Sequence, residues 1–96
     1  MKTIKERLPF LSEFDQNIME EMNAQYECGM ITPKQGMNRL NIVLSRTDAK
    51  NHESVLLFAP RVIVSALWSD LAKFGQVFGA GIRLQKLANE VLNATE

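Results

Sequence analysis

The sequence predicts an all-α fold: one compact domain over residues 1–96, built from four helices, or five if the chain breaks at Pro60. Three observations support this. Apolar residues recur at helical spacing in several segments, and capping or turn residues separate those segments. Residues 55–59 alone could form a strand, but the sequence offers no second strand to pair with it. With 46% hydrophobic and 23% charged residues, the composition is that of a globular protein rather than a disordered one.

The first predicted helix covers residues 13–28, after a short lead-in over residues 1–11. Ser12 is a suitable N-cap, and Gly29 suits the position after the helix, where the backbone takes a positive φ. Between these signals, one apolar stripe runs along the helix at four-residue spacing: Phe14, Ile18, Met22 and Tyr26, with Met19 beside it.

The second predicted helix covers residues 33–46 and has the clearest start signal in the chain. Thr32 can cap the helix, Pro33 fits its first position, and Gln35 completes a capping box. Its apolar face carries Gly36, Met37, Leu40, Val43 and Leu44. Because only a few residues connect the first two helices, we expect them to form an antiparallel hairpin.

The remaining helices are predicted over residues 52–74 and 76–94, after a polar loop over residues 47–54. Either Asn51 or Ser54 could cap the first of them. Pro60 clashes with a preceding helical turn, so it either bends this helix or ends it; we favour a bent one. Gly75 then predicts a tight turn between the two helices, or close packing of their backbones.

Charge and cysteine content exclude several classes of protein. The net charge is zero, so no overall field attracts the chain to nucleic acid or to an anionic membrane. A single cysteine, Cys28, cannot form an internal disulfide and suits a reducing compartment. Charged residues interrupt the long apolar stretch over residues 55–92, so we do not expect it to span a membrane. We expect a soluble cytoplasmic protein.

Few residues could take part in catalysis or bind a metal ion. We therefore predict no enzyme activity and no bound metal or cofactor. His52 reads as a surface-loop histidine and Cys28 as an ordinary helix-end cysteine; nothing in their spacing suggests a catalytic dyad. One histidine and one cysteine cannot supply the ligands of a zinc site. Residues 75–81 are rich in glycine, but they lack the Lys-Ser/Thr ending of a phosphate-binding loop.

Acidic and basic residues are segregated along the chain. From residue 8 to residue 33 there are five acids and no base: Glu13, Asp15, Glu20, Glu21 and Glu27. The second helix carries Arg39 and Arg46 away from its apolar stripe, with Lys50 just beyond. These helices either attract each other weakly within one molecule or present charged docking surfaces to a partner.

The last two helices carry a wider apolar arc than one packing contact covers. Trp68, Phe78, Ile82 and Leu92 compete for the little interior that a small domain has. Either the helix over 52–74 is enclosed on all sides, or these residues form an interface with a partner. We expect self-association here, as a homodimer.

Two hypotheses of function follow. The first is a non-enzymatic protein–protein interaction module, such as an adaptor, an inhibitor or an assembly component, that docks through a helix face. A phage or mobile-element protein that binds a host enzyme would fit this description. The second is a small DNA-binding regulator that uses Arg39, Arg46 and Lys50, although the acidic first helix is a poor neighbour for DNA.

Overall fold

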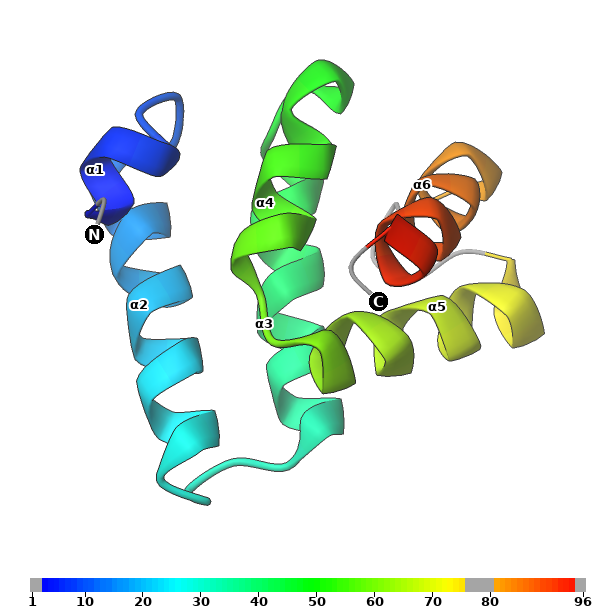
Figure 1. The fold of residues 1–96 in the computed structure, drawn as a ribbon, viewed down its shortest axis with the longest axis horizontal. Helices are drawn as coiled ribbons and strands as arrows, with labels where there is room; N and C mark the ends of the chain where they lie inside the picture. The colour runs from blue at the N-terminus through cyan, green and yellow to red at the C-terminus, as the bar shows by residue number, and fades with distance from the viewer. Residues whose placement is uncertain (1–2, 76–80, 95–96) are drawn as a thin grey trace.

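The chain folds into six α-helices and one short 3₁₀ helix in the computed structural model, which describes residues 3–75 and 81–94 (Figure 1). No strand occurs in this described part, so the all-α prediction is confirmed. The radius of gyration is 12.2 Å. In chain order the elements are α1 (Ile4–Arg7), α2 (Glu13–Glu27), α3 (Pro33–Ser45), η1 (Ala49–Asn51), α4 (His52–Phe58), α5 (Arg61–Phe74) and α6 (Ile82–Ala94).

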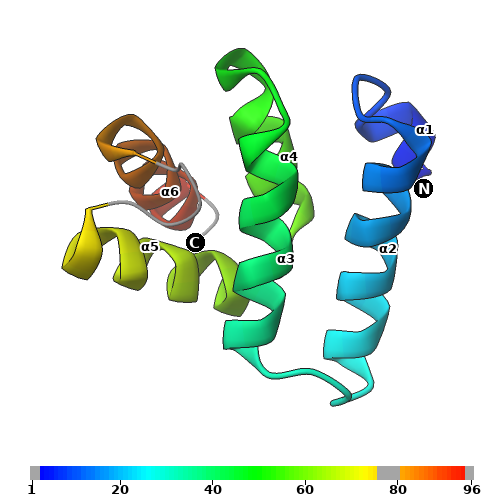
Figure 2. The same cartoon turned by 180° about the vertical axis from the view of Figure 1, so that it is seen from behind.

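Helices α2 and α3 form the predicted antiparallel hairpin and lie side by side in both views (Figures 1 and 2). The Ser12 hydroxyl accepts the backbone N–H of Asp15 at 3.1 Å and caps α2. At the start of α3, the capping box between Thr32 and Gln35 is complete. Gly29 lies just after the end of α2 with φ +74°. The N–H groups of Gly29 and Met30 donate to carbonyls in the last turn of α2. Local signals therefore set both ends of this hairpin.

The helix expected over residues 52–74 is instead two helices, α4 and α5. Ala59 takes an extended conformation, with ψ 153°, because a residue that precedes proline is pushed out of the helical region. Pro60 follows with ψ 139°, and α5 begins only at Arg61. The prediction of a bent helix was therefore wrong, and the chain breaks. As a result α4 packs on α6, while α5 turns across α3 (Figure 1).

The described part of the lead-in, residues 3–11, contains a sixth, short α-helix, so the predicted count of four or five helices was too low. Thr3 caps the short helix α1, and Ile4, Leu8 and Leu11 are buried in the core. The side-chain amide of Gln16 donates to the Leu8 carbonyl at 3.0 Å and fixes the lead-in against α2. Ile4, Leu8 and Leu11 have the spacing of one helix face, but the segment is short and Pro9 interrupts it, so the pattern gives only a weak signal.

All six helices contribute to the core, in which α3 packs against α2 and α5, and α6 packs against α4 and α5. Gly36 of α3 lets the backbone approach Ile63 of α5, and both residues are buried. Gly75 ends α5 with φ +73°, and the rest of the predicted turn lies outside the described residues. The expected start of the last helix at residue 76 lies outside the described residues. No described helix is long and apolar enough to cross a bilayer.

Candidate docking face on the helical hairpin

His52 and Cys28, the two reactive side chains considered above, lie at the ends of different helices. His52, expected in a surface loop, is half-buried as the first residue of α4, and its Nε2 lies 2.9 Å from the backbone oxygens of both Leu44 and Thr47. It thereby holds the start of α4 against the end of α3. Cys28 is exposed at the end of α2, as expected. The described residues contain no cluster of three or more His, Cys, Asp or Glu side chains that could hold a metal ion.

A better candidate is a strip along the outer side of the α2–α3 hairpin, which we call the α2–α3 face. Residues spaced three, four or seven apart on each helix share one side of it, so these side chains form two adjacent rows. The middle of the face is a hollow of about 200 Å³ between the two helices. The members are Phe14, Ile18, Glu21 and Gln25 on α2, and Arg39, Ile42 and Arg46 on α3.

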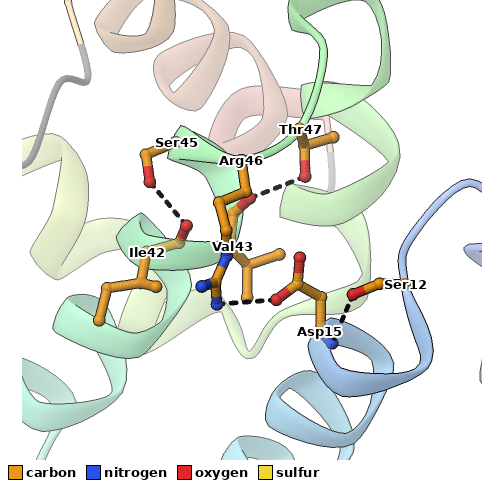
Figure 3. A network of polar contacts seen from close by, with 7 residues as sticks. All are labelled: Ser12, Asp15, Ile42, Val43, Ser45, Arg46 and Thr47. Atoms are coloured by element: carbon orange, nitrogen blue, oxygen red, sulfur yellow. Dashed lines mark hydrogen bonds and ion pairs between the residues drawn. The ribbon is translucent and has the colours of Figure 1, made fainter.

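One end of the face is fixed by the ion pair between Arg46 and Asp15, whose nitrogen and oxygen lie 2.8 Å apart (Figure 3). The Asp15 side chain is only 8% exposed, whereas the Arg46 side chain is 47% exposed. The same guanidinium lies 5.5 Å from the centroid of the Phe14 ring, a cation–π distance. Arg46 therefore shields a buried carboxylate and also supports the exposed ring.

Two side-chain hydrogen bonds stabilise the last turn of α3 beside this ion pair. The Ser45 hydroxyl donates to the Ile42 carbonyl, and the Thr47 hydroxyl donates to the Val43 carbonyl, both at 2.7 Å (Figure 3). Regular backbone donors run out at the end of a helix, and these hydroxyls add side-chain donors there; the Val43 carbonyl also accepts the Arg46 N–H at 3.1 Å. The backbone that carries Ile42 and Arg46 is thus held in a defined geometry.

At the other end of the face, Arg39 donates a hydrogen bond to the side-chain oxygen of Gln25. That partner is neutral, so the Arg39 charge is not compensated by it. Glu21 lines the same hollow and makes no ion pair with any residue in the described part of the chain. The hollow therefore has an acid on its α2 wall and a base on its α3 wall, and the described residues form no ion pair with either.

The charged residues singled out from the sequence thus fall into two groups. Glu21, Arg39 and Arg46 meet on the α2–α3 face, whereas Glu20 is exposed on α2 and does not line the hollow. Lys50 is exposed in η1. The attraction expected between the two oppositely charged helices is observed, because Arg46 of α3 pairs with Asp15 of α2.

The last two helices, α5 and α6, do leave large apolar side chains exposed, because Phe74 is 71% and Val62 is 49% exposed besides Ile82. Trp68 and Leu92 are half-buried and pack against the core. Ile82 is 70% exposed, while Phe78 lies outside the described residues. Of the four residues expected to form an interface, Ile82 alone is both described and largely exposed.

The sequence did not mark Phe14 and Ile42 as surface residues, although Phe14 is 65% exposed and Ile42 is 39% exposed. Phe14 was assigned to the core stripe of the first helix. A four-residue step turns about 40° beyond a full helical turn, so a stripe at that spacing drifts out of the core over three steps. Buried Met19 and Met22 mark the true inner face. Helical geometry could therefore have placed Phe14 at the edge.

Comparisons with models of known protein families, with curated proteins and with solved structures find no match to this chain. Function therefore has to be inferred from the α2–α3 face itself.

Proposed function

We propose that this protein is a non-enzymatic protein–protein interaction module, acting as an adaptor, inhibitor or assembly component, and that it docks through the α2–α3 face. One observation carries the proposal: Phe14, Ile18 and Ile42 form an apolar strip on the outside of a rigid hairpin, flanked by Glu21 and Arg39. An apolar centre with a charged rim is the usual anatomy of a protein interface. An aromatic ring held by a neighbouring guanidinium is a typical interface anchor.

The alternative, a DNA-binding regulator, has less support. Arg39 and Arg46 are both bonded to α2, and a phosphate would have to compete with the buried Asp15 for Arg46. Glu21 on the same face would also repel a polyanion. We therefore keep nucleic-acid binding as an outcome of the test rather than as the proposal.

The proposal is tested by photo-crosslinking with a benzophenone amino acid at position 14, compared with the same probe at position 24. Ala24 is also on α2, but it does not line the α2–α3 face. We expect position 14 to give a discrete protein adduct in the native host, and position 24 to give none. Excess unlabelled protein should compete for this adduct, whereas excess Ile42→Asp variant should not.

Two results would contradict the proposal. One is an identical pattern of adducts, or an absence of adducts, from both probe positions. The other is retention on heparin that weakens with salt and is lost when Arg39 and Arg46 are both changed to glutamate, which would favour the DNA-binding regulator.

A further inference from the structure

We infer that the α2–α3 face binds a second copy of this chain, in a twofold pair in which α2 of each copy lies across α3 of the other. The inference rests on the proposed function of this face as a docking surface, and it names the occupant. Twofold pairs use the same patch on both subunits, so the patch must be complementary to itself. The distribution of charge and of apolar side chains on this face meets that condition.

The charges are complementary under twofold symmetry. Glu21 lies on the α2 wall of the hollow and Arg39 lies on the α3 wall, and neither forms an ion pair with a residue that the structure describes. When α2 of one copy lies across α3 of the other, Glu21 meets the partner's Arg39, and Arg39 meets the partner's Glu21. One contact made twice thus compensates both charges on both copies.

The apolar residues have the same symmetry. The Phe14–Arg46 contact marks one end of the face, and the Gln25–Arg39 hydrogen bond marks the other. A twofold axis parallel to the two helices keeps each residue at its own height along the hairpin. Ile18 therefore faces the partner's Ile42 at the centre, while Phe14 faces the partner's Arg46 and gains a second cation–π contact.

A second copy fits the charges of the face better than a partner that is predominantly acidic or basic. A strongly acidic protein would compensate Arg39 but repel Glu21, and a strongly basic protein would do the reverse. A second copy compensates both side chains. The chain has zero net charge, so two copies approach each other without long-range repulsion.

The test uses two charge reversals on the full chain, Glu21→Lys and Arg39→Glu, with sedimentation equilibrium as the measure of association. Each variant alone places like charges opposite one another twice in its own homodimer. We expect each change to weaken homodimerisation by about tenfold. When the two variants are mixed, the lysine introduced at position 21 of one copy meets the glutamate introduced at position 39 of the other, and the unchanged pair forms on the other side. We expect the mixture to associate as tightly as the unmodified protein.

One variant carries an affinity tag, so that the two chains differ in mass. Native mass spectrometry then distinguishes heterodimers from homodimers in the mixture. The matched controls are Glu20→Lys on α2 and Lys86→Glu on α6, which reverse charges away from the face and should leave association unchanged. Far-UV circular dichroism and urea unfolding show that each variant is folded. Phe14→Ser should also weaken association, and Ile82→Ser should not.

The inference is overturned if the protein stays monomeric at high micromolar concentration, or if the two variants fail to associate with each other when mixed. It is also overturned if Ile82→Ser abolishes association and Phe14→Ser does not, because the interface would then lie on α6. A monomeric protein that still gives a discrete adduct with another protein at position 14 would overturn this inference alone. A monomeric protein that gives no adduct there would overturn the proposed function as well.

Discussion

Replacement of Gly36 by alanine should destabilise the protein, although alanine is the better helix former. A Cβ atom at this position would overlap Cδ1 of Ile63 and lie 2.9 Å from its Cγ1, closer than carbon atoms can approach. Ile63 has no exposed surface, so its side chain cannot turn away without displacing other core residues. The contact between α3 and α5 has to open or distort instead.

The magnitude follows from two opposing terms. Overpacking a core typically costs about 1–3 kcal/mol, and the overlap with Ile63 favours the upper end of that range. Replacing glycine by alanine inside a helix returns about 1 kcal/mol through helix propensity. We therefore expect Gly36→Ala to lower the free energy of unfolding by about 2 kcal/mol. For a chain of this length, this corresponds to a melting temperature lower by roughly 8–16 °C.

A double-mutant cycle with Ile63→Ala separates this clash from other effects. Ile63→Ala alone should cost about 2–5 kcal/mol, but it removes the atoms that the new Cβ would meet. In that background Gly36→Ala should stabilise by about 1 kcal/mol. Gly29→Ala is the matched control: Gly29 has φ +74° and open space around it, so its cost of about 1 kcal/mol is backbone strain and should not depend on Ile63.

The assay is urea unfolding, followed by the fluorescence of Trp68, the one tryptophan of the chain, and by far-UV circular dichroism. A Gly36→Ala variant as stable as the unmodified protein would refute the packing explanation. So would an equal loss of stability with isoleucine and with alanine at position 63, because the cost would then arise elsewhere.

Two further substitutions and one NMR measurement test other contacts. Arg46→Ala removes the partner of the buried Asp15 carboxylate, and urea unfolding should show a loss of about 1–2 kcal/mol; an unchanged midpoint would mean that water replaces the guanidinium. Leu8→Ala should cost about 2–4 kcal/mol in the same assay, because Leu8 is 1% exposed; a loss near zero would mean that α1 does not contribute to the core. The neutral His52 side chain should carry its proton on Nε2, since carbonyl oxygens can only accept; nitrogen chemical shifts from NMR that place the proton on Nδ1 would contradict the observed contacts.

Local chemistry explains why the hairpin was predictable. The caps at Ser12 and Thr32 and the turn at Gly29 each depend on residues no more than a few positions apart. Such signals act within a single helical turn and do not require tertiary contacts. The predicted helices over 13–28 and 33–46 accordingly match α2 and α3 to within one residue at each end.

Elements that depend on distant contacts were not predictable in the same way. The break at Pro60 is a local effect, but the packing of α4 against α6 joins segments that are distant in the sequence. The lead-in folds because Leu8 and Gln16 meet, eight residues apart and across a turn. Neither contact leaves a periodic pattern in the sequence.

The candidate site was predictable in its residues but not in its geometry. Charge segregation identified Glu21, Arg39 and Arg46, because blocks of like charge are visible in the sequence. The pairing of Arg46 with Asp15 joins residues 31 positions apart, and it depends on the register of the hairpin. Among the described residues, Glu21 and Arg39 are then the charges of the face that form no ion pair.

The two sides of α3 suggest that folding and docking are separable in this molecule. Gly36 and Ile63 hold the inner side of α3 against α5, whereas Arg39 and Ile42 lie on the outer side. A change on the inner side should alter the free energy of unfolding and affect association only through the loss of folded protein. A change at Arg39 should alter association with little effect on unfolding, because its bond to Gln25 is partly exposed. Surface residues that carry binding energy but little folding energy are expected where a face has been shaped by a partner.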